Sequence, residues 1–181
     1  MELPKHMVEV EKLMQKYHDL EAREGQLRKE VSQLWDFLEN ASMPLHWVNG
    51  SGIIVWVNQA ELNFLGYTKH EYLNKHISKF HADKETIEDI LRRLINKETL
   101  QNYSARMVCK TGDIKDVLIN SNVFWEEDKF IHTRCFTRDV TELRKAEREK
   151  EAIIKKLETR VMQLENENKE LKKQTLAPRS N

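Results

Sequence analysis

The chain has 181 residues, of which 33% are charged and 39% hydrophobic, and its mean hydropathy is −0.72. This balance leaves less core-forming material than the length suggests, so part of the chain is expected to be solvated helix. The 30 Lys and Arg residues cancel the 30 Asp and Glu residues, which excludes a global field that would attract nucleic acid or an anionic membrane.

The apolar repeat in residues 1–35 predicts a coiled-coil helix. Val at a and Leu at d of a strict seven-residue repeat favour a two-stranded parallel coil, with Glu24 in the one polar slot. The alternative is a single amphipathic helix packed on its own domain, but such helices usually carry a wider apolar stripe. The predicted dimer-interface residues in this segment are Val10, Leu13, Tyr17, Leu20, Leu27, Val31 and Leu34.

Residues 36–140 predict a compact domain that opens with a hairpin. The runs "PLHWVN" and "GIIVWVN" are β-branched and aromatic, and "GSG" separates them. Asn58 and Glu61 then form a capping-box-like pair at the start of a helix, and Gly66 is placed to end it. Thr68 and Glu71 repeat the start signal at once.

The second half of this domain predicts one further helix and three strands. Asp83 is placed to cap "KETIEDILRRLINKE", in which Ile87, Ile90, Leu91 and Leu94 share one apolar face. Strands are expected at 102–110, 114–123 and 129–138, broken by "KTGD" and "WEED". The economical architecture for this order is α+β: an antiparallel sheet with helices on one face.

The heptad pattern of residues 141–174 predicts a second coiled-coil helix. Leu143, Ala146, Lys150 and Ile153 follow one seven-residue phase, and the residues after Leu157 follow another, so a stutter lies at Leu157. Asn168 falls at an a position, where a buried Asn pair favours a parallel dimer in one register. The alternative is a lone solvated helix, and residues 175–181 are expected to be a disordered tail. The predicted interface residues here are Leu157, Val161, Leu164, Asn168 and Leu171.

About one hundred central residues resemble the Per-Arnt-Sim (PAS) sensor family, especially the PAS domains of bacterial sensor histidine kinases. The resemblance rests on "GIIVWVNQAELNFLGYT", on the "KTGD" hairpin and on "TRDVTELRKAE". It implies a five-stranded antiparallel sheet with helices forming a pocket over one face. Asp139 and Thr141 match the family's link from the last strand to the exit helix, so they are the expected signal-linkage residues. Family members bind small ligands, dimerise, and signal through flanking helices to kinase, cyclase or DNA-binding domains.

The implied pocket would lie between the sheet and the helix that carries Ile87 to Leu94. Strand periodicity places the apolar side chains of the third and fourth strands toward this helix. The same side chains also fit an ordinary core without a void, and that alternative stays open. The candidate pocket residues are His46, Trp47, His76, His81, Ile90, Leu94, Met107, Val117, Ile119 and Cys135.

The sequence does not identify a cofactor. The segment "NKHISKFHAD" lacks the cysteine that resemblance to the photoreactive flavin branch would require. The helix near Ile87 lacks the histidine of haem-binding relatives, although His76 or His81 could ligate iron. His132 and Cys135 are three apart on a predicted strand, so they face opposite ways and no metal site is expected.

No enzyme is expected, because nucleotide-binding, nucleophile-elbow and zinc-protease motifs are missing. No histidine follows His132, so the exit helix carries no phosphoacceptor, and the output domain is expected outside this sequence or on a separate protein. The chain contains no apolar run of bilayer length, and "MELPKHMVEV" is not a signal peptide, so a cytoplasmic location is expected. Cys109 and Cys135 are expected as buried free thiols.

The leading hypothesis is therefore a parallel homodimeric PAS sensory module that couples a small-ligand pocket or core state, through its coils, to a kinase or other effector. One alternative is a dimerisation spacer that senses nothing, and a second is a haem-binding sensor. The third is a zipper-type DNA-binding regulator, which the acidic residues among Arg144, Lys145 and Arg148 argue against. Neither nucleic acid nor a membrane is expected as a partner.

Overall fold

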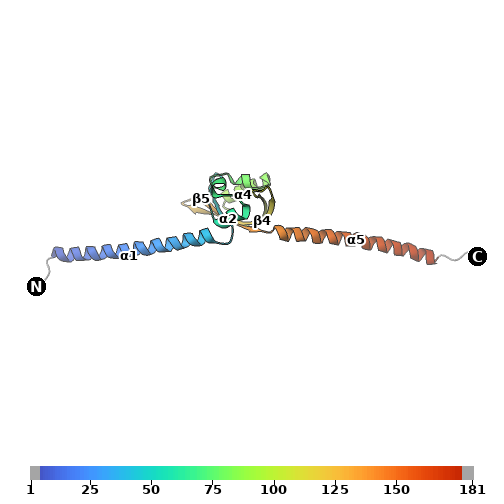
Figure 1. The fold of residues 1–181 in the computed structure, drawn as a ribbon, viewed down its shortest axis with the longest axis horizontal. Helices are drawn as coiled ribbons and strands as arrows, with labels where there is room; N and C mark the ends of the chain where they lie inside the picture. Colours follow the sequence, from blue (N-terminus) through green and yellow to red (C-terminus); the bar gives the residue numbers. More distant parts are fainter. Residues whose placement is uncertain (1–4, 177–181) are drawn as a thin grey trace, which may run out of the picture.

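The computed structural model describes residues 5–176 and shows an α+β domain between two long helices (Figure 1). The N-terminal half contains α1 Lys5–Asn40, β1 Leu45–Val48, β2 Ile54–Val57, α2 Gln59–Leu65, α3 Lys69–Tyr72 and the 3₁₀ helix η1 Ile77–Phe80. The C-terminal half contains α4 Lys84–Ile95, β3 Leu100–Val108, β4 Ile114–Glu126, β5 Lys129–Asp139 and α5 Thr141–Leu176.

The five strands form one antiparallel sheet in the order β2-β1-β5-β4-β3. The helices between β2 and β3 cover one face, and the apolar core lies between them and the sheet. On β3 and β4 the inward side chains alternate along the strand: Ala105 and Met107 are buried on β3, and Val117 and Ile119 are buried on β4. The predicted fold is confirmed, and Cys109 and Cys135 are both buried free thiols.

The β1–β2 hairpin closes through a loop that needs a glycine. Asn49 Oδ1 accepts hydrogen bonds of 3.0 Å from the backbone N–H groups of Ser51 and Ile53. Gly52 has φ 75°, and a Cβ there would collide with the imidazole of His76. The position therefore excludes larger residues for two independent reasons.

The helix-boundary predictions are confirmed where they depend on local contacts. Gly66 ends α2 with φ 79°, and its N–H donates to Leu62 O. Thr68 and Glu71 form the expected capping box of α3. The Asn58 side chain caps α2 by accepting from Glu61 N, but Glu61 does not complete a capping box, because its carboxylate turns into the core.

The prediction that the Asp83 side chain caps α4 is wrong. Asp83 occupies the N-cap position of α4, yet its carboxylate makes no cap hydrogen bond. Instead it forms a bidentate pair with Arg106 on β3, with Nε to Oδ2 at 2.8 Å. A guanidinium binds both carboxylate oxygens at once, which is stronger than one bond to a backbone N–H.

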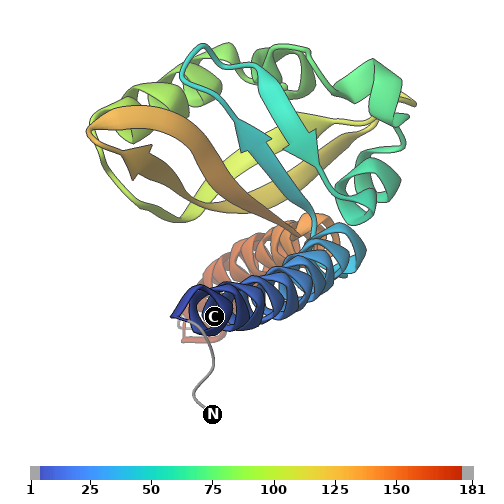
Figure 2. The ribbon, with the colours of Figure 1, turned by 90° about the vertical axis from the view of Figure 1, so that its left-hand side faces the viewer.

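The two long helices leave the domain in opposite directions along nearly one line, and both lie on the side of the domain away from α4 (Figures 1 and 2). Helix α1 ends at Asn40, five residues beyond the expected boundary at 35, and α5 runs to Leu176, so the predicted tail at 175 begins within helix. The remainder of that tail, 177–181, and residues 1–4 lie outside the described residues.

Candidate functional site

Three polar side chains from three elements meet in the core beneath the hairpin. His46 of β1, Glu61 of α2 and Tyr72 of α3 are 2%, 0% and 0% exposed. His46 Nδ1 lies 3.0 Å from Glu61 Oε1, and the Tyr72 hydroxyl donates to the same oxygen at 3.0 Å. The second oxygen, Glu61 Oε2, is buried without a hydrogen-bond partner in the described structure.

The geometry favours an imidazolium facing a carboxylate. Burial by itself would lower the pKa of His46, but Cys135, its cross-strand neighbour, and Glu61 act in the opposite direction and raise that pKa well above 6.5. Burial and the Glu61 charge raise the pKa of Tyr72 well above 10, so its hydroxyl remains a donor. A buried ion pair of this kind is expensive to break, since the group left behind is an uncompensated charge.

Next to this cluster is a small cavity of about 20 Å³. Its wall includes two buried polar atoms without partners in the described structure, His81 Nδ1 and Ser121 Oγ. A void of this volume holds about one water molecule, so the folded core has no room for a haem or flavin ring. The pKa of His81 is lowered to about 4, mainly by burial and then by repulsion from His46; the nearby Asp83 acts in the opposite direction but does not offset them.

The predicted pocket residues fall into three groups. Six of them line the cavity: His46, His81, Ile90, Leu94, Ile119 and Cys135. Met107 and Val117 are buried in the same core but away from the void. The other two are Trp47 and His76, and neither lines the cavity.

Trp47 lies on the other face of the sheet. Its ring stacks on His132 with centroids 4.2 Å apart and planes 7° apart, and it also contacts Trp56 and Trp35. His132 and Cys135 therefore face opposite ways, as expected. His76 sits at the hairpin loop, where its ring accepts from Ser78 N at the start of η1.

Sequence reasoning missed Glu61, Tyr72 and Ser121 as members of the buried polar site. Glu61 was assigned to a helix cap, and no motif marks the other two. The available signal was the position of Glu61 on α2: it precedes Leu62 and lies four residues before Leu65, both of which are core residues. An acidic residue on the apolar side of a short helix indicates a buried partner.

At the N-terminal junction, Asn58 ties the end of α1 to the domain. Its side chain is fully buried. Oδ1 accepts from Leu45 N and Glu61 N, each at 3.0 Å. Nδ2 faces three carbonyl oxygens, those of Met43 at 2.9 Å and of Leu38 and Ala41 at 3.3 Å. The last carbonyls of a helix lack partners within the helix, and here a core residue supplies one.

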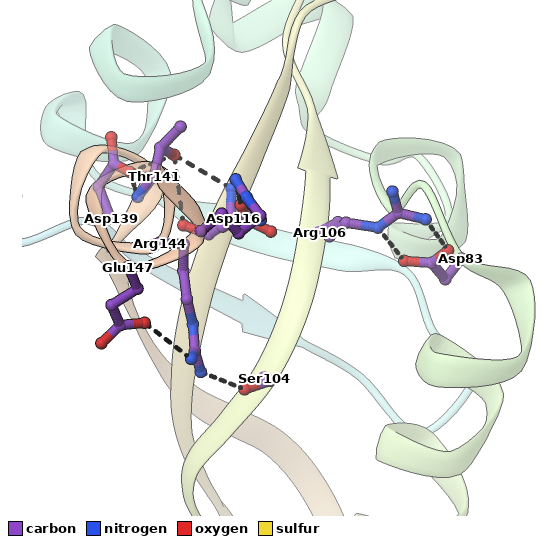
Figure 3. Close-up of polar contacts among 9 residues, drawn as sticks. Asp83, Ser104, Arg106, Asp116, Asp139, Thr141, Arg144 and Glu147 are labelled. Atoms are coloured by element: carbon purple, nitrogen blue, oxygen red, sulfur yellow. Dashed lines mark hydrogen bonds and ion pairs between the residues drawn. The ribbon is translucent and has the colours of Figure 1, made fainter. Parts of the chain in front are cut away.

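At the C-terminal junction, Val140 alone separates β5 from α5. Thr141 Oγ1 donates to Asp139 Oδ1 at 2.6 Å, and the same carboxylate oxygen accepts from Thr141 N. The hydroxyl of Thr141 also accepts from Asp116 N on β4 at 3.1 Å. Figure 3 shows these side chains converging where α5 begins. The two predicted linkage residues thus fasten the first turn of α5 to the sheet.

Two arginines extend this attachment along α5. Arg148 Nη2 donates to Asp116 Oδ2 at 3.0 Å. Arg144 Nη2 donates to the Ser104 hydroxyl on β3 at 3.5 Å (Figure 3). Both arginines are largely exposed, so each contact contributes little stability. They contact β3 and β4 from α5 beyond its first residue.

A larger open groove of about 770 Å³ lies on the surface between the end of α1, α2 and the end of β5. It is separate from the buried polar site. Within residues 5–176, no group of three or more His, Cys, Asp or Glu side chains is arranged to hold a metal ion. None of the helices described is long and apolar enough to cross a bilayer.

A family model described as "PAS domain" matches residues 41–142, which is more than half of the chain. The chain belongs to the PAS domain family. PAS domains are generally sensory or signalling modules, and in sensor kinases they often couple to effector domains. No curated protein sequence matches this PAS chain.

Solved structures show the same fold. The PAS domain of an HTR-like protein from Haloarcula marismortui is 24% identical, with a TM-score of 0.57, and the match covers 66% of this chain and 98% of that one. A PAS domain from a two-component sensor histidine kinase is 15% identical, with a TM-score of 0.52 and coverage of 62% and 97%. An RNA-binding light-oxygen-voltage receptor is 17% identical, with a TM-score of 0.61 and coverage of 68% and 37%.

The heptad residues of both flanking helices are solvent-exposed in the single PAS chain. Their apolar members are between 41% and 65% exposed, and Asn168 is exposed as well. Such a row of large apolar side chains on an isolated helix is typical of a surface that another helix covers. Whether the helices pair with a second copy stays a prediction.

Proposed function

We propose that the chain is a dimeric PAS sensory module that passes the state of its core to an output partner through α1 and α5. The observation that carries this proposal is that side-chain hydrogen bonds fasten both helices to the domain where they join it. Asn58 holds the Leu38 carbonyl in the last turn of α1, and Asp139 with Thr141 holds the start of α5. A change in the core would therefore alter the direction of a helix rather than dissipate in a loop.

The exposed heptads support a parallel homodimer. Fully burying one leucine side chain stabilises by about 1.5–3 kcal/mol, and seven apolar positions on α1 alone are available for burial. The partner that receives the signal is a kinase or another effector, fused to this chain or separate, and the module itself is not an enzyme. A cytoplasmic location fits such a partner.

The size of the cavity favours a second candidate, a dimerisation spacer that senses no ligand. A core with room for about one water molecule has no preformed place for a larger molecule. DNA binding receives less support, because Arg144 and Arg148 already bond to the domain.

The test begins with the mass of the purified protein by light scattering. The wild type should have the mass of a dimer, whereas Leu20→Glu combined with Leu27→Glu should give a folded monomer because two charges enter the seam. Lys12→Glu, on the same helix but outside the seam, is the matched control. A monomeric wild type would refute the dimeric module and the spacer together.

Native mass spectrometry and a thermal-shift ligand screen then separate sensor from spacer. A bound molecule whose removal changes the distance between the two α5 helices, measured between spin labels, supports the sensor. A core that stays empty and rigid in every condition supports the spacer.

A further inference from the structure

The buried pair and the end of α1 are joined by a continuous run of hydrogen bonds. Glu61 contacts His46 through its carboxylate and Asn58 through its backbone N–H. The amide of Asn58 then reaches the carbonyls of Leu38 and Met43. Every side chain in this run is buried, so water cannot substitute for a lost contact at low cost.

We propose that α1 reads the protonation state of His46, with Glu61 and Asn58 as the mechanical connection. This inference rests on the proposed function, since it names the signal and the helix that carries it. It makes α1, and not only the exit helix, a responding element.

Loss of the His46 proton would leave the Glu61 carboxylate buried with only neutral partners. The groups that face His46 are Glu61 from α2, Tyr72 from α3, Cys135 from β5 and His81 from the segment before α4, and none of these is a cation that could replace it. Glu61 Oε2 already lacks a hydrogen bond. The least costly relief is a shift of Glu61 toward solvent, because a buried unpaired charge is strongly unfavourable.

A shift of Glu61 would move the first turn of α2. Asn58 immediately precedes that turn and accepts from Glu61 N at 3.0 Å, so the amide cannot stay in place while the turn moves. Its hydrogen bonds to the Leu38 carbonyl in the last turn of α1 and to the Met43 carbonyl just after the helix would then weaken. The end of α1 lies beneath the hairpin and α2 (Figure 2). Loss of the Asn58 hydrogen bonds would therefore change the angle of α1 relative to the domain.

Trp35 provides a reporter at the end of α1. Its ring lies 5.7 Å from that of Trp47 and 6.0 Å from that of Trp56. Ring packing of this kind sets the fluorine chemical shift of a labelled indole, and the label leaves the buried cysteines untouched. The full chain would be labelled with 5-fluorotryptophan, and the Trp35 resonance assigned with Trp35→Phe.

The experiment follows the Trp35 fluorine resonance and the His46 imidazole resonance from about pH 6 to about pH 10. We expect the two to titrate with one midpoint. His46→Gln should abolish the Trp35 transition, and Glu61→Gln should move it to lower pH, because the imidazolium loses its counter-charge. Asn58→Ser keeps a capping hydroxyl but loses the amide donors, so Trp35 should stop responding while His46 still titrates.

Gln59→Ala is the matched control, since Gln59 is the exposed neighbour of Asn58 and its amide reaches only Asn63. It should leave both titrations unchanged. A Trp35 resonance that does not titrate, or that titrates equally in His46→Gln, would overturn the proposal. Light scattering on the same samples distinguishes the two hypotheses. A dimer without the Trp35 transition would refute only the response of α1 to His46 protonation, whereas a monomer would refute the proposed function.

Discussion

Replacing His81 with glutamine should remove much of the acid sensitivity of the folded domain. His81 is 8% exposed, and its pKa is lowered to about 4 because burial and the nearby His46 disfavour a second imidazolium. In the unfolded chain the pKa returns to about 6.5. Unfolding therefore takes up a proton between these two values, and the free energy of unfolding falls as the pH falls through this range.

The magnitude follows from the two pKa values. Their difference corresponds to about 3 kcal/mol once the loss is complete, near pH 4, and to about 2 kcal/mol at pH 5. Above about pH 7 the contribution vanishes, because the side chain is then neutral in both states. Glutamine stays neutral throughout and can still form hydrogen bonds, so the variant lacks this loss.

The assay is urea denaturation of both proteins at about pH 5 and about pH 8, at one protein concentration because a dimer's stability depends on it. From the higher to the lower pH, the wild type should lose about 2 kcal/mol more than His81→Gln. His70→Gln, on the exposed side of α3, is the control and should follow the wild type. Equal losses in the wild type and His81→Gln would refute the argument that His81 is held neutral in the core.

Three further predictions concern the remaining parts of the site. Glu61→Leu should lower the free energy of unfolding by about 3–5 kcal/mol at pH 6. Because the pKa of His46 is raised, the stabilising charge of His46 is complete below about pH 6.5 and is lost at higher pH, so this cost should shrink as the pH rises. A cost that does not change with pH in urea denaturation would contradict the ion pair. Gly52→Ala should lower thermal stability by more than Gly112→Ala, because both have positive φ but only Gly52 faces a side chain, and equal shifts in melting temperature would count against the collision with His76. Thr141→Val should cost about 1 kcal/mol and speed amide exchange in the first turn of α5, whereas Thr141→Ser should not, and unchanged exchange in the valine variant would show that the hydroxyl does not hold the helix.

Several features of the fold could be predicted because their causes lie within a few residues. Gly66 ends α2 since only glycine adopts its positive φ without strain, and Thr68 with Glu71 begins α3 through contacts three residues apart. The apolar face of α4 follows from helical periodicity in the same way. Glu61 and Asp83 have equally clear local roles, yet His46 and Arg106 capture their carboxylates, because a cation binds a carboxylate more strongly than a backbone N–H does.

The sequence by itself determined the two long helices, the order of helices and strands between them, and the resemblance to the PAS family, because periodicity, caps and turns are local properties. Only the tertiary structure decided which polar groups meet in the core and how much space they leave. His46 and Glu61 are 15 residues apart, Asn58 and Leu38 are 20 apart, and Val48 meets Thr133 across 85. Contacts over such separations depend on how whole elements pack, and so the cavity of about 20 Å³ and the tie from the core to α1 came from the fold.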